Sequence, residues 1–237
     1  MTTPIAPAAR AFHFIRLRMA GATIQDRMLA CVGAFVGILS AILAAWISGF
    51  DGTNLSLLVA PIGASAVLVF AVPSSPLAQP WSVMGGNGLS ALTGLLIAFS
   101  VPEPVFAMAA AVSLAILVMT FTRSLHPPGG ASALTMVIVY IATPTLAVPT
   151  LFLILLNSAG LVGVALLFHR VQGRSYPHRP LQSSPETNAV PTFDQASIRA
   201  AVLEMGDVFD VTEADLTAIF ERAAKHAQKS AKADFGA

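Results

Sequence analysis

The chain has 237 residues, of which 55% are hydrophobic and only 11% are charged, and its formal net charge is +1. A soluble domain carries about 25% charged residues, so the composition excludes an ordinary soluble protein and indicates a membrane protein. The balanced charge offers no basic surface for nucleic acid, and a single cysteine, Cys31, excludes an internal disulfide framework.

Residues 1–28 form a basic leader that carries four arginines, Arg10, Arg16, Arg18 and Arg27. Residues 10–19 mix these charges with apolar side chains, which suits either a helix lying along the inner leaflet or an unstructured basic leader. The apolar segment that follows is longer than the core of a signal peptide, which takes about 7–15 residues. We therefore expect it to be retained as a helix.

Six apolar segments follow in what we predict to be a transmembrane domain over residues 29–169. They are Leu29–Ser48, Ser56–Val72, Gly86–Val101, Pro104–Thr122, Ala131–Thr143 and Thr150–His169. A full crossing needs about 20 residues, and the second, third and fifth segments are shorter than that. Short segments interrupted by Pro or Gly predict helices inside a bundle; alternatively, each helix extends beyond its apolar segment.

Arginines flank both the first and the last segment, which predicts that both termini face the cytoplasm and that the number of crossings is even. Six crossings place Asp51 and Glu103 in outer loops and Arg123 in an inner loop. A four-helix core with two re-entrant segments would share the same parity. We expect about six short transmembrane helices in an all-α fold.

Residues 170–192 are rich in proline and predict a linker, and residues 193–237 predict a small helical cytoplasmic tail. Helical spacing is present over Ala196–Met205 and Thr212–Gln228, with Thr212 as an N-cap. Two helices of this size cannot bury a core alone. They are expected to dock on the membrane domain or on another subunit.

A seven-residue motif occurs twice: PIGASAV at residues 61–67 returns 67 residues later as PGGASAL at residues 128–134, with five of seven positions identical. On the six-crossing topology the two copies are antiparallel, which is typical of an inverted three-plus-three repeat. Proline suits the first turn of a helix, so each copy predicts a helix start with free N–H groups. Chance similarity among small residues is the competing explanation.

Two helix N-termini that point toward the midplane would favour a small anion or a polar neutral solute. The six segments contain no Asp or Glu, which disfavours a cation. His126 could bind an anion when protonated or pass a proton, or it could only cap a helix. The predicted substrate-binding residues are Pro61, Gly63, Ser65, Asn87, Arg123, His126, Pro127, Pro128, Gly129, Gly130 and Ser132. Close packing, interhelical hydrogen bonds and topology are the structural alternatives for these residues.

The run RSLHPPGG at residues 123–130, with residues 60–66, 72–80 and 85–87, resembles the HPP family of integral membrane proteins over most of residues 25–170. The resemblance implies a compact helical membrane domain of a bacterial member, related to plastid and cyanobacterial nitrite transporters. Many bacterial relatives continue into a nucleotide-binding pair of CBS domains. This chain has only two predicted helices there, so we expect no nucleotide regulation.

The leading hypothesis is a transporter or channel for a small inorganic anion, with nitrite implied by the resemblance. The alternative is a membrane-embedded receptor or scaffold that acts through its tail. A single histidine with Asp51 and Glu103 on the opposite side makes no catalytic constellation, so we expect no enzyme, no cofactor and no metal site. The expected location is the bacterial inner (plasma) membrane, where the chain contacts the lipid bilayer and is compatible with a homo-oligomer.

Overall fold

A computed structural model describes residues 23–50, 52–178, 195–205 and 216–224 of the chain, with side chains other than those of 52–59 and 195. The chain divides into two units, one over Ile24–Arg179 and the other combining Met1–Thr23 with Pro180–Ala237. The predicted leader helix at 10–19, Asp51, most of the predicted linker and the Thr212 cap lie outside the described residues.

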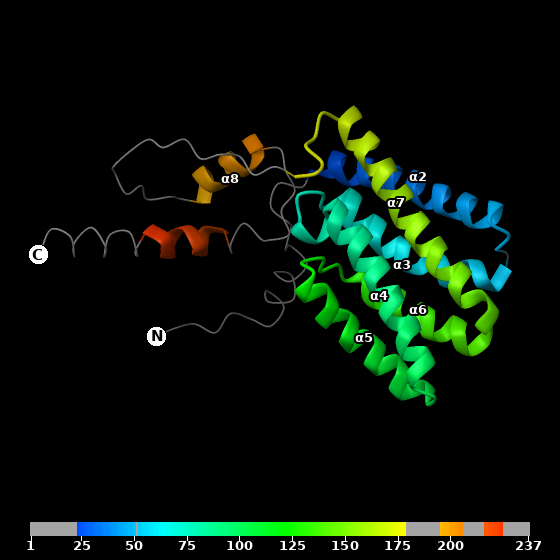
Figure 1. The fold of residues 1–237 in the computed structure, drawn as a ribbon. Coiled ribbons are helices and arrows are strands. Elements are labelled where there is room, and N and C mark those ends of the chain that lie inside the picture. The colour runs from blue at the N-terminus through cyan, green and yellow to red at the C-terminus, as the bar shows by residue number, and fades with distance from the viewer. Residues whose placement is uncertain (1–22, 51, 179–194, 206–215, 225–237) are drawn as a thin grey trace, which may run out of the picture. The chain divides into compact units, whose positions relative to one another are not determined.

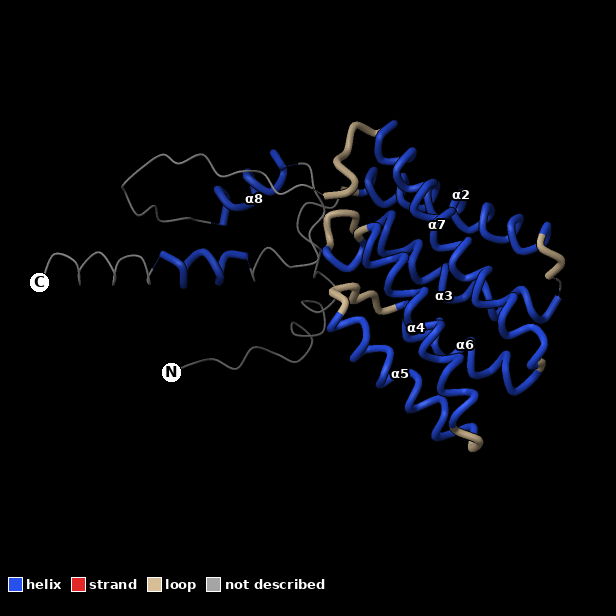
Figure 2. The backbone as a smooth tube through the Cα atoms, viewed as in Figure 1, coloured by secondary structure: helices blue, strands red, loops and turns tan. Residues whose placement is uncertain are grey.

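The unit Ile24–Arg179 is a bundle of apolar helices joined by short connections (Figures 1 and 2). Its helices are α2 (Ile24–Ile47), α3 (Gly52–Ala71), α4 (Pro80–Ser100), α5 (Pro104–Phe121), α6 (Pro128–Ala142) and α7 (Ala147–Val171). No strand occurs in the part of the chain that the structure describes. The predicted all-α membrane fold is confirmed.

Among the described residues, four stretches are long and apolar enough to cross a membrane: α2, α4, α5 and Pro144–Val171, which includes a short 3-10 turn before α7. Helix α6 is apolar but shorter, and the part of α3 whose side chains the structure describes, Ala60–Ala71, is apolar as well. Helix α4 begins at Pro80, six residues before the apolar segment predicted there. The prediction was too short because Ser82 of the first turn is polar and yet buried against the bundle, and Pro80 occupies a first-turn position that suits proline.

Small residues let the helices approach closely, as they do in many membrane proteins. Helix α5 buries Ala107, Ala111 and Ala115 along one face at helical spacing. A Cβ on Gly94 of α4 would lie 2.3 Å from the carbonyl oxygen of Ala133 in α6. The two backbones are therefore in direct contact, and only glycine fits at position 94.

The connections 72–79 and 122–127 and the residues after α7 meet at one end of the bundle, here called the His126 end (Figure 1). Burial raises the pKa of Tyr176, so its phenol stays protonated and donates to the Ala78 carbonyl at 2.8 Å. At the same end, Trp81 Nε1 donates to the Thr122 carbonyl and the His178 N–H donates to the Gln79 side chain. Arg174 forms an ion pair with Asp26. Residues 174–178, at the start of the predicted linker, are thus bound to the helical unit.

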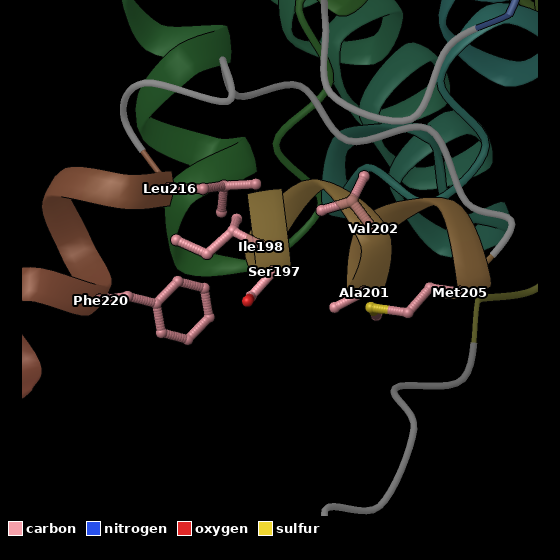
Figure 3. A pocket seen from close by; sticks show the side chains of 7 residues that line it. All are labelled: Ser197, Ile198, Ala201, Val202, Met205, Leu216 and Phe220. Carbon is pink, nitrogen blue, oxygen red and sulfur yellow. The ribbon is translucent and has the colours of Figure 1, made fainter. Parts of the chain in front are cut away.

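The tail contains α8 (Gln195–Met205) and a helix over residues 216–224. The helix predicted at Ala196–Met205 is confirmed, and the described part of the second predicted helix is helical. Ile198 and Val202 of α8 are buried against Leu216. Figure 3 shows these side chains, with Phe220, around an apolar cavity of about 360 Å³.

Candidate functional site

A chain of hydrogen bonds joins four side chains with 0% exposure inside the bundle: Ser65, Asn87, His126 and Ser132. The distance from His126 Nε2 to Ser65 Oγ is 2.8 Å, and the Asn87 amide nitrogen donates to the same Ser65 oxygen at 3.0 Å. Ser132 Oγ donates to the Asn87 amide oxygen at 3.0 Å. We call these four residues the polar network.

Three helices and one connection supply the polar network. Ser65 comes from α3, Asn87 from α4 and Ser132 from α6, while His126 stands two residues before α6 in the connection 122–127. His126 reaches the network because the adjoining α4 position is Gly86, where a Cβ would lie 2.4 Å from the Cβ of His126. A side chain at position 86 would push the imidazole out of the bundle.

The hydrogen bonds of His126 define its protonation. Its Nδ1 lies 2.8 Å from the Leu77 carbonyl, which can only accept, so Nδ1 carries a proton. Burial lowers the pKa of His126, which lies in the connection between α5 and α6, to about 4. At neutral pH the ring is therefore uncharged, and Nε2 accepts the Ser65 hydroxyl proton.

Ser65 has one proton and two acceptors within reach. Besides Nε2 of His126 at 2.8 Å, the carbonyl of Pro61 lies 3.0 Å from Ser65 Oγ. The hydroxyl can turn to Pro61 if Nε2 gains a proton and becomes a donor. Both protonation states of His126 are thus compatible with the same heavy-atom positions.

The predicted pair of helix starts is wrong for the first copy of the motif. Pro61 lies inside α3, which begins at Gly52, whereas Pro128 does begin α6. The helix continues through Pro61 because neighbouring helices help a spanning helix to tolerate an interior proline. In the second copy, Gly129 and Gly130 donate their N–H groups to the carbonyls of residues 126 and 127. Two sets of free donors therefore do not converge.

Gly63 and Gly130, two of the predicted substrate-binding residues, have room around them. A Cβ on Gly63 would meet nothing within 4 Å, and one on Gly130 would come no nearer than 3.7 Å to Val112. The close approach is at Gly129, where a Cβ would lie 2.6 Å from the Gly86 carbonyl. The motif copies place their serines together and leave Gly63 and Gly130 in ordinary surroundings.

Arg123 and Pro127 lie outside the polar network. Helix α5 ends at Phe121, so Arg123 follows the helix and shares no helical turn with His126; it is exposed, with a left-handed φ of 53°. Pro127 is exposed, and Pro128 is buried at the first turn of α6.

Deeper polar atoms were not predicted as part of the site. Ser90 lies about one helical turn beyond Asn87 on α4, and Asn157 and Ser158 lie on α7, which packs against α4. Their exposure is 0%, 2% and 0%, respectively. The hydroxyls of both serines and both amide atoms of Asn157 have no hydrogen-bond partner among the described residues. Of these residues only Asn157 carries a signal in the sequence, because its place in the last apolar segment loosely matches that of Asn87 in the third.

The helices and the buried polar network define a multi-pass membrane protein with a polar centre. The family model described as "HPP, transmembrane region" matches residues 19–177, and the chain belongs to this family. It is 43% identical over 107 residues to one transmembrane protein of Dictyostelium discoideum, and 41% identical over 117 residues to another. These matches cover 44% and 48% of this chain but only 37% of each relative. No solved structure matches the chain.

Proposed function

We propose that the chain is a transporter that moves a small inorganic anion together with a proton, through a path centred on the polar network. The observation that carries this proposal is the meeting of Ser65 and Ser132, equivalent residues of the two motif copies, on one buried Asn87. Polar groups inside a membrane domain are costly and usually mark a functional path. The two halves of the bundle thus share one polar centre.

His126 is the proton carrier in this proposal. A bare anion is very costly in a low-dielectric interior unless it is paired. An imidazolium beside it makes the pair neutral, and the Pro61 carbonyl gives Ser65 an acceptor when Nε2 is protonated. An arriving anion raises the proton affinity of His126, so anion and proton enter together.

The unpartnered polar atoms of Ser90, Asn157 and Ser158 support a path that continues beyond the network. Each buried polar group without a partner costs free energy, about 1–3 kcal/mol in proteins. Water, or a passing solute with both hydrogen-bond donors and acceptors, would form hydrogen bonds with these groups. The substrate class is therefore a small oxyanion of a weak acid, and nitrite is the first candidate because of the family resemblance.

Uptake into proteoliposomes that contain only this protein tests the proposal. Nitrite uptake should exceed that of empty liposomes, which corrects for nitrous acid that crosses the lipid unaided. It should rise when the outside is more acidic than the lumen. Nitrate and formate added as competitors define the anion class. Uptake of nitrite, nitrate and formate is also measured separately, and uptake equal to that of empty liposomes for all three would reject anion transport.

His126→Gln tests the proton step. It keeps a polar side chain but removes titration, so nitrite uptake measured between about pH 5.5 and 8 should lose its pH dependence. The matched control is His178→Gln, at the same end of the bundle but outside the polar network. If His126→Gln leaves the pH profile unchanged, the imidazole is structural and coupling lies elsewhere.

The alternative function, a membrane receptor or scaffold, is favoured by one observation in the tail. Its two helices leave the cavity between Ile198, Val202 and Phe220 open rather than filled (Figure 3). A receptor would show no flux in proteoliposomes, and its biological output would depend on the tail. A transporter would keep its flux when Ala201→Glu places a charge in that cavity.

A further inference from the structure

A groove of about 670 Å³ lies beside the last turns of α7 and the residues that follow it, at the His126 end. Its wall on α7 is formed by Gly163, Leu166 and Leu167. The two leucines are 41% and 66% exposed, and a Cβ on Gly163 would meet nothing within 4 Å. This wall is an apolar surface on a membrane-spanning helix, so lipid chains cover it.

The other part of the groove is basic and polar. Arg170, Arg174 and Ser175 line it, together with Tyr176 and Pro177. Arg174 is held by its ion pair with Asp26, whereas Arg170 is exposed. No carboxylate is among the described residues that line the groove. The groove therefore keeps a net positive charge after the Arg174 pair is counted.

The distance between the two parts suits a phospholipid. Arg170 follows Gly163 by seven residues, which is about 10 Å along a helix at 1.5 Å per residue. The headgroup region on each side of a bilayer is about 5–8 Å thick. Gly163 therefore stands at the level of the acyl chains when Arg170 stands at the level of the phosphate, and Leu166 and Leu167 lie between them, about 4–6 Å from Arg170 along the helix.

We propose that this groove binds one anionic phospholipid, with its phosphate on Arg170 and an acyl chain along Gly163, Leu166 and Leu167. The planar guanidinium donates two parallel hydrogen bonds to phosphate oxygens, which a lysine cannot reproduce. Zwitterionic lipids offer the same phosphate but add a cation that faces the arginines. The groove should therefore select phosphatidylglycerol over phosphatidylcholine with the same chains.

Native mass spectrometry and thermal unfolding of the full chain in detergent test the site. Phosphatidylglycerol should remain bound and raise the unfolding temperature, and phosphatidylcholine should do neither. Arg170→Gln should weaken phosphatidylglycerol binding about tenfold or more, the amount expected for a charge-assisted hydrogen bond. Arg27→Gln, which removes another exposed arginine at the same end but outside the groove, should leave binding unchanged.

Gly163→Leu provides a second variant that the backbone can accept, since open space surrounds position 163. It fills the acyl part of the groove and should lower phosphatidylglycerol retention while Arg170 is intact. Equal losses in Arg170→Gln and Arg27→Gln would overturn the site, as would equal binding of the two lipids. Displacement of the lipid by inorganic phosphate at similar concentration would also overturn it, because the apolar wall would then contribute nothing.

Discussion

Ser65 and Ser132 bind opposite ends of one side chain: the Asn87 amide nitrogen donates to Ser65, and the Asn87 amide oxygen accepts from Ser132, each at 3.0 Å. The two serines occupy the same position in the two motif copies, 67 residues apart. They lie on α3 and α6, which run in opposite directions because both the connection after α3 and the one before α6 stand at the His126 end. Asn87 thus links the two halves of the bundle.

Asn87→Leu should lower the free energy of unfolding by about 1–3 kcal/mol, because it keeps the approximate size of the side chain but leaves Ser65 and Ser132 without their partner. Thermal unfolding in detergent measures the loss. Thr93→Val on the same helix is the control, since it removes only a local bond to the Leu89 carbonyl. Similar stability of the two variants would show that the network contributes little to folding.

His126 should make the protein less stable in acid. Its folded-state pKa of about 4 lies below the unfolded value of about 6.5. Between these values the unfolded chain binds more protons, so stability falls as the pH decreases from 6.5 toward 4, by about 1–3 kcal/mol. Unfolding temperatures at several pH values should show a shallower slope in His126→Gln. Equal slopes for the unchanged protein and His126→Gln would contradict the lowered folded-state pKa of His126.

The glycines should respond to substitution in opposite ways. Gly129→Ala places a Cβ 2.6 Å from the Gly86 carbonyl, so it should disrupt the packing of α6 on α4 and reduce the yield of folded protein. Gly63→Ala meets open space and should be neutral or stabilising by up to about 1 kcal/mol, because alanine favours the helix. Size-exclusion profiles and unfolding temperatures would compare the two variants. A lower unfolding temperature for Gly63→Ala would contradict the open surroundings of position 63.

Glu103 and Arg123 should face opposite sides of the membrane, since they lie in the connections at either end of α5. Cysteines introduced at these positions, after the exposed Cys31 is replaced by alanine, report their accessibility. A membrane-impermeant maleimide added to intact cells should label position 103 and spare position 123, as expected if arginines mark the cytoplasmic side. Labelling of 123 alone would reverse the orientation, and labelling of both would contradict the topology.

Two truncations should differ in their effect on the stability of the helical unit. Removal of residues 179–237 leaves the helical unit with its contacts intact and should preserve a single species in detergent. Removal of residues 173–237 also deletes Arg174 and Tyr176, which hold Asp26 and the Ala78 carbonyl, and should lower the unfolding temperature. If both truncations aggregate, the tail itself supports the membrane domain.

Helix positions could be predicted from sequence because long uncharged runs have few other stable forms in a membrane. The repeat also predicts, from the sequence alone, that Ser65 and Ser132 belong to one site. The role of Pro61 could not be predicted, since proline suits both a helix start and a tolerated interior position, and only packing distinguishes them. The same limit applied to Gly63 and Gly129, whose surroundings depend on which helix face meets a neighbour.

Three hydrogen bonds at the His126 end are asymmetric in a way that affects which residues can be substituted. In each of them a side chain donates to a backbone carbonyl: His126 to Leu77, Trp81 to Thr122 and Tyr176 to Ala78. Every residue type presents a carbonyl, so the accepting positions are free to exchange side chains of suitable size. The donors are not. Mutational scans should therefore find single intolerant positions rather than pairs that change together, and methods that infer contacts from paired substitutions should miss these three contacts.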